Sequence, residues 1–224
     1  MSLRKLLPAV VLAIAGTAVD AQTTITTNGG SSVGFFGGSP FSRTFGQTFT
    51  TPTDNRLNSF SFFVAGRPST LNFRAYVVAF DVDFLGRWRP TTSTPVFTSG
   101  LLSVTTNGED LSRVDILTSG LALVAGQRYG AFLSTLDVVN SSTTGLIFSK
   151  GSDQYAGGEF VSFNGTTTAW NSEFWTGSQG EDLQFVLSFS PGGPTNVVPE
   201  PGTYALLGTG LLVMGAVGRR RRRA

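Results

Sequence analysis

Apolar side chains alternate with other residues, position by position, in several short segments of this chain. Phe60, Phe62 and Val64 share one face of such a segment, and residues 185–189 repeat the pattern. A period of two is typical of β-strands, because successive side chains point to opposite faces of the pleated backbone. Residues 73–80 carry apolar side chains on both faces, which predicts a further strand that is buried on both sides.

Gly, Asn and Ser separate these segments, and all nineteen Phe of the chain lie within residues 23–195. About nine short strands of this kind predict an all-β domain over residues 22–195, a single β-sandwich that is jelly-roll-like, with a closed barrel as the alternative. Residues 23–39 either lack order or supply a first edge strand near 33–36. Further strands are expected at 45–51, 95–104, 114–117, 128–136, 146–149 and 159–163.

The composition excludes several kinds of chemistry. The chain has no His and no Cys, which removes Ser-His-Asp and Cys-His catalysis, disulfides and Cys-ligated zinc. The net charge of +2 comes from the chain ends, where seven of the sixteen cations lie. The arginines of the central domain are scattered and its acids outnumber its bases, so nucleic-acid binding has no support.

Residues 1–21 resemble a secretory signal peptide. Arg4 and Lys5 form a basic start, residues 6–18 are mostly apolar, and small residues stand at the positions that signal peptidase reads. Cleavage is therefore expected after Ala21.

Residues 196–224 have three parts. Val198, Pro199, Glu200 and Pro201 open an extended segment over 198–203, because proline fixes φ and donates no hydrogen bond. Residues 204–218 carry no charge and predict a transmembrane helix, although at ~1.5 Å per residue it reaches about 22 Å of a ~30 Å hydrocarbon core. Positive residues resist translocation, so the chain end is expected in the cytoplasm. The positive cluster consists of Arg219, Arg220, Arg221, Arg222 and Arg223.

This order of motif, apolar helix and arginine cluster resembles the PEP-CTERM sorting domain of exopolysaccharide-producing Gram-negative bacteria. The resemblance implies an exosortase partner that cleaves near Pro199–Pro201. It also implies a transient stay in the inner membrane, followed by delivery to the cell surface or extracellular matrix, with exopolysaccharide as a further partner. The alternative is a plain C-terminal membrane anchor with a basic flank.

Asp81 and Asp83 are candidate metal ligands. Period two places both carboxylates on one side of a strand end, where they could share Ca²⁺ with loop carbonyls. The alternative is a pair of exposed acids near Arg87 and Arg89, and it is favoured because two carboxylates are too few ligands for Ca²⁺. Two further acidic pairs, 109–110 and 181–182, follow Gly and are expected in solvated turns.

The aromatic residues Trp88, Tyr155, Trp170 and Trp175 are candidates for sugar contact, since sugars stack their apolar faces on aromatic rings. Trp88 lies in the loop-like segment 86–90, and Trp170 and Trp175 lie in a stretch rich in Gly and Thr. The alternative is that each ring packs onto the core.

The sequence as a whole predicts an exported protein with a structural, adhesive or polysaccharide-binding domain. No catalytic residues and no cofactor are expected. A secreted carbohydrate-active enzyme with two nearby carboxylates is one alternative, and a passive matrix component without a specific ligand is another.

Overall fold

The computed structural model of the chain describes residues 22–37, 41–82, 87–139, 146–173, 175–178 and 180–192. Within these ranges every regular element is a β-strand, so the predicted all-β class is confirmed. The chain divides between Pro191 and Gly192 into two units, and every described strand belongs to the first. The strands are β1 Thr23–Thr26, β2 Ser31–Phe36, β3 Thr44–Thr50, β4 Arg56–Val82, β5 Trp88–Pro90, β6 Phe97–Thr98, β7 Leu102–Ala122, β8 Arg128–Ser134, β9 Leu146–Ser152, β10 Phe160–Phe163, β11 Thr176–Ser178, β12 Glu181–Leu183 and β13 Phe185–Ser190.

Strand β4 runs without a break through two segments that the sequence pattern predicts as separate strands. Its pairing with β7 shifts between Val64 and Gly66, and again between Gly66 and Ser69. Pro68 falls in the second shift, where its missing N–H removes no ladder bond. Bulges of this kind bend a strand rather than end it, so β4 takes part in two layers of the fold.

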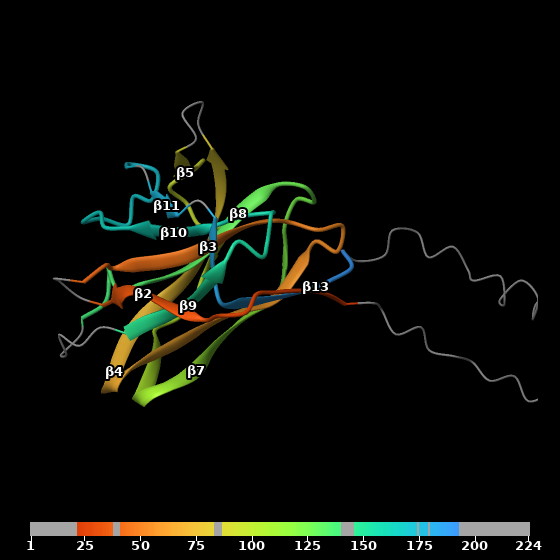
Figure 1. Ribbon diagram of the computed structural model, residues 1–224. Helices are drawn as coiled ribbons and strands as arrows, with labels where there is room; N and C mark the ends of the chain where they lie inside the picture. Colours follow the sequence, from red (N-terminus) through yellow and green to blue (C-terminus); the bar gives the residue numbers. More distant parts are fainter. Residues whose placement is uncertain are drawn as a thin grey trace, which may run out of the picture. The chain divides into compact units, whose positions relative to one another are not determined.

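One antiparallel sheet forms both layers (Figure 1). In the first layer, the early part of β4 pairs with β13 and β7, while β1 pairs with β13. Strand β9 pairs with β4 at Val64 and Ala65, and it also pairs with β2 and β12. In the second layer, the late part of β4 pairs with β8, which leads to β3, β10 and β11. The sheet therefore curls into a sandwich-like arrangement, while jelly-roll connectivity stays a prediction.

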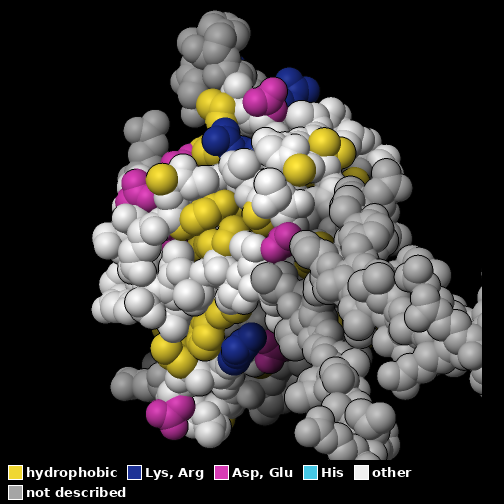
Figure 2. All heavy atoms as spheres, turned by 90° about the vertical axis from the view of Figure 1, so that its right-hand side faces the viewer, with side chains coloured by type: hydrophobic (Ala, Val, Ile, Leu, Met, Phe, Trp, Pro, Cys, Tyr) yellow, Lys and Arg dark blue, Asp and Glu magenta, His cyan; other side chains and the backbone are white. Residues whose placement is uncertain are grey.

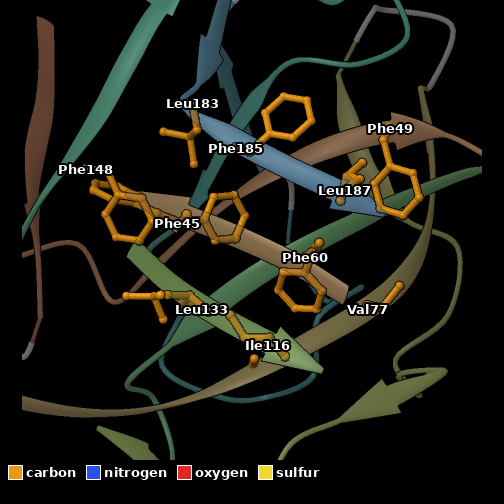
Figure 3. Close-up of a cluster of buried hydrophobic side chains, with 14 of the residues drawn as sticks. Phe45, Phe49, Phe60, Val77, Ile116, Leu133, Phe148, Leu183, Phe185 and Leu187 are labelled. Atoms are coloured by element: carbon orange, nitrogen blue, oxygen red, sulfur yellow. The ribbon is translucent and has the colours of Figure 1, made fainter. Parts of the chain in front are cut away.

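Side chains from both layers meet in one buried cluster (Figure 3). The ring centroid of Phe49 in β3 lies 5.9 Å from that of Phe189 in β13, and that of Phe45 lies 5.4 Å from Phe148 in β9. The second pair meets edge to face, an arrangement that aromatic quadrupoles favour. The apolar faces predicted at 60–64 and 185–189 point into this core, which confirms them.

The late part of β4 is buried on both faces, as its sequence predicts. One face contributes to the main core, and the other faces a second aromatic cluster on the outside of the second layer. A strand with two buried faces thus separates the main core from the aromatic cluster. The residues on the first face are Phe73, Ala75, Val77 and Ala79, and those on the second are Tyr76, Val78 and Phe80.

Candidate functional site

The three tryptophans lie together on the outer face of the second layer. Trp88, Trp170 and Trp175 are 8%, 1% and 3% exposed. The indole nitrogen of Trp175 donates to the carbonyl oxygen of Trp170 at 3.0 Å, and the Trp175 amide donates to the carbonyl of Trp88 at 3.1 Å. Sugar stacking needs an exposed ring face, so this burial favours core packing over the predicted sugar contact.

Neighbouring strands supply the rest of this aromatic cluster. The Phe132 ring of β8 meets Trp170 and Trp175 at centroid distances of 5.0 and 4.9 Å. On the cluster's rim, the Arg128 guanidinium lies 4.8 Å from the Trp88 ring centroid, a cation–π contact. Sequence reasoning missed this contact, because 40 positions of chain separate the two residues and no local pattern links them.

Tyr155, the fourth aromatic candidate, lies instead beside the main core. Its hydroxyl accepts a hydrogen bond from the Thr50 amide at 3.1 Å and donates one to the Thr50 carbonyl at 3.2 Å. Burial raises the pKa of this hydroxyl. Tyr155 therefore ties the segment after β9 to the end of β3.

The residues that follow Trp88 and Trp170 in the sequence line an open hollow of about 340 Å³, at the small end of the ~300–1,000 Å³ typical of ligand sites. The Arg89 guanidinium crosses to the neighbouring loop and donates to the Asn171 carbonyl oxygen at 3.0 and 3.2 Å. Asp81 stands opposite Arg89 in the pairing of β4 with β5, and its exposed carboxylate accepts a hydrogen bond from the Val82 amide at 2.8 Å. The described lining residues are Asp81, Val82, Arg89, Pro90, Thr91 and Asn171.

The predicted calcium pair is only half described. Asp83 lies outside the described residues, so the site it would form with Asp81 stays a prediction. Among the residues that are described, no three His, Cys, Asp or Glu side chains gather closely enough to hold a metal ion.

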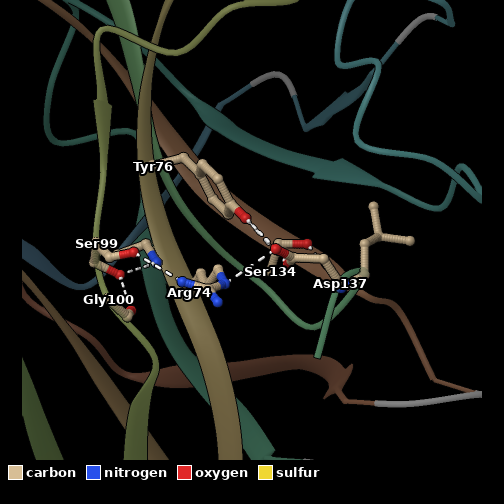
Figure 4. Close-up of polar contacts among 8 residues, drawn as sticks. Arg74, Tyr76, Ser99, Gly100, Ser134 and Asp137 are labelled. Carbon is tan, nitrogen blue, oxygen red and sulfur yellow. Dashed lines mark hydrogen bonds and ion pairs between the residues drawn. The ribbon is translucent and has the colours of Figure 1, made fainter. Parts of the chain in front are cut away.

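A set of polar side chains that contact one another lies near the aromatic cluster, at the end of β8 (Figure 4). Arg74 Nε lies 3.0 Å from Asp137 Oδ2 in an ion pair, and the Tyr76 hydroxyl donates to the same carboxylate at 3.1 Å. Burial raises the pKa of Tyr76 most, and the negative charge of Asp137 raises it further. Tyr76 thus remains a neutral donor, and the group fixes the end of β8 to β4.

Asp182 is buried at 1% exposure, so the prediction of a solvated turn at 181–182 is wrong for this residue. Its carboxylate accepts hydrogen bonds from the Gln47 side chain at 2.7 Å and from the amides of Gln154 and Tyr155, each at 2.8 Å. Gln47 in turn accepts from the Leu183 amide at 2.9 Å. These bonds join β3, β12 and the segment after β9, a convergence that no local sequence signal reveals.

The predicted sorting and targeting residues lie outside the described part of the chain. They include Ala21, residues 198–203 and 204–218, and the arginines at 219–223. No helix within the described ranges is long and apolar enough to cross a membrane.

Residues 197–223 match the family model of the PEP-CTERM protein-sorting motif. The chain is a PEP-CTERM protein. This motif implies an exported protein that an exosortase sorts at the membrane and that then reaches the cell surface. The match includes Pro199, Glu200 and Pro201 together with all five terminal arginines.

Comparisons of the whole PEP-CTERM protein add little beyond the tail. No curated protein matches it. One solved structure that resembles its fold contains the cysteine protease and lectin-like domains of Cwp84, a surface layer associated protein of Clostridium difficile. The likeness has a TM-score of 0.40 and 11% identity, and it covers 67% of this chain and 32% of that one.

Proposed function

We propose that this PEP-CTERM protein is a non-catalytic component of the cell surface or extracellular matrix. The proposal rests on the sorting motif at 197–223, because this motif directs the attached β-domain out of the cell. The described face in Figure 2 supports it, since uncharged polar groups and backbone cover much of the surface and charges are sparse. A chain without His or Cys also lacks the commonest nucleophile and base pairs.

Within this proposal the tail is a temporary tether. The apolar segment 204–218 holds the precursor in the inner membrane, and the arginines keep its end in the cytoplasm. Pro199 and Pro201 keep Glu200 in an extended backbone that a protease can bind. Cleavage near this point releases the β-domain toward its surface acceptor.

Replacing both Pro199 and Pro201 by alanine should leave most of the protein as an uncleaved precursor in the inner membrane, because the stiff recognition segment is lost. Cell fractionation with an antibody against the β-domain measures the distribution. The matched control is alanine at Pro191 and Pro194, two prolines that precede the motif. Normal maturation of the first double variant would overturn the role of the motif.

The hollow beside Trp88 supports a second part of the proposal, in which the domain binds polysaccharide. Its described lining combines a carboxylate, a guanidinium, a hydroxyl and an amide side chain with the apolar side chains of Pro90 and Val82. Such groups pair with sugar hydroxyls, and the hydrogen bond between Arg89 and Asn171 holds the two sides of the hollow in place. This site replaces the buried indole rings as the expected point of contact.

Asp81→Ala and Arg89→Ala should each weaken binding of the producing strain's exopolysaccharide about tenfold, the effect of losing one hydrogen bond to a charged group. Co-sedimentation of the protein with the polymer measures the affinity. Arg56→Ala is the control, since Arg56 is also an exposed arginine but lies in the first layer. Equal affinity of the native chain and all three variants for the polymer would exclude the hollow as the binding site.

A further inference from the structure

Strand β7 forms an edge of the first layer (Figure 1). Its residues 112–117 pair in regular register with residues 59–64 of β4. In the described part of the chain, no strand pairs with the other side of β7. An edge of this kind presents unpaired N–H and C=O groups, which can form a ladder with another strand.

The outward side chains of this stretch form an ordered series. Leu117 ends the stretch and Leu111 immediately precedes it; their side chains are 76% and 52% exposed. Between them stand Arg113 and Asp115, each about half exposed. Positions 111, 113, 115 and 117 share one face of the strand, because side chains alternate with a period of two.

This series is complementary to itself when reversed. In an antiparallel pair centred on Val114, residue 113 of one copy stands opposite residue 115 of the other, and residue 111 opposite 117. Each Arg113, which already pairs with Asp115 of its own copy at 2.7 Å, then also faces the Asp115 of the other copy, and each Leu111 faces a Leu117. Cross-strand pairs of opposite charge and of apolar side chains are those that stabilise sheets.

We propose that β7 is a homodimerisation edge, at which two copies of this chain join their sheets antiparallel about Val114. The contacts already present in one copy prepare the edge. Ser61 Oγ donates to Asp115 Oδ1 at 2.6 Å and accepts from Arg113 at 3.1 Å, which holds both charged side chains over the strand. The Arg113 guanidinium also lies 5.9 Å from the Phe63 ring centroid.

The ends of the regular stretch limit the contact to about seven residues. Register shifts occur beside Gly66 and Gly108 at one end and between Ser59 and Leu57 at the other, where bulges twist the edge away. A ladder this short favours a reversible dimer over continued sheet growth. This inference rests on the β-domain and is independent of the proposed polysaccharide contact.

Cysteine cross-linking tests the register, because the chain has no native Cys. Full-length Leu111→Cys and Leu117→Cys chains are mixed in detergent micelles and treated with a bifunctional maleimide that spans about 8 Å. Opposed positions have Cβ atoms ~5 Å apart. In the same dimer, residue 111 of one chain lies about 20 Å from residue 111 of the other chain, because the two are six residues apart along the strands. The mixture should therefore cross-link at least about tenfold more than either variant alone.

Charge variants test the complementarity directly. Adding Arg113→Glu to both cysteine chains should abolish the cross-link, because every charged pair becomes acid against acid. Placing Arg113→Glu in the Leu111→Cys chain and Asp115→Arg in the Leu117→Cys chain should restore it, which also shows that both variants fold. Leu111→Cys mixed with Val124→Cys is the control, since Val124 is 60% exposed and lies outside the stretch. No cross-link in the first mixture, or one that is indifferent to these charges, would overturn the dimer.

Discussion

Trp170→Ala should lower the free energy of unfolding by about 3–5 kcal/mol, the usual cost of deleting a large buried aromatic ring. Trp170 is 1% exposed, and its ring centroid lies 5.0 Å from both Tyr76 and Phe132 and 5.8 Å from Phe163. Alanine leaves a cavity among rigid rings that cannot close around it. Chemical denaturation followed by far-ultraviolet circular dichroism measures the loss.

Val139→Ala is the matched control for this prediction. Val139 is 92% exposed, so its side chain should change stability by about 0.5 kcal/mol or less. Trp170→Phe should fall between the two, because a smaller ring fills part of the space. If Trp170→Ala and the native chain unfold at the same denaturant concentration, the second aromatic cluster contributes nothing to the stability of the fold.

Asp182→Ala should cost a similar amount, about 3–5 kcal/mol, for a different reason. The substitution removes the acceptor of one buried donor, on Gln47, and of two partly buried amide donors, of Gln154 and Tyr155. A buried donor without a partner costs about 1–3 kcal/mol. Equilibrium denaturation measures the change. Glu181→Ala is the neighbouring control: its ion pair with Lys150 is partly exposed and is worth about 1 kcal/mol or less.

The pH dependence of stability tests the burial of Asp182 independently. Burial raises the pKa of this carboxyl above its ordinary 3.8, although its hydrogen bonds lower it in part. Because the folded pKa exceeds the unfolded one, the contribution of Asp182 to stability is greatest below pH 3.8 and falls as pH rises through the folded value. The free energy of unfolding of the native chain minus that of Asp182→Asn should therefore decrease over this interval. An increase would contradict the buried site.

The strand content could be predicted because it depends on local alternation. Phe60, Phe62 and Val64 face the core as their spacing indicates, and residues 73–80 are buried on both sides. The union of both segments in one strand could not be predicted. Gly66 and Pro68 are typical of a turn, and only pairing with β7 across the sheet makes them a bend within β4.

The candidate sites show the same division. Asp182 stands two positions after Gly180, in a sequence typical of an exposed turn, but its burial depends on Gln47 and Tyr155, which are distant in sequence. The burial of Trp88 likewise depends on rings from other segments and on Arg128. No local pattern carries either fact, because each environment forms only when the sheet curls.

The all-β class and the sorting tail both follow from the amino-acid sequence. Alternation is a property of neighbouring residues, and the motif at 197–223 is linear, so neither needs a folded chain to be recognised. Only the folded chain shows that the tryptophans are buried, that Asp182 lies in a polar network, and that β7 stands at an edge. These features arise from contacts between residues far apart in the chain, whose partners are set by how the sheet closes on its core.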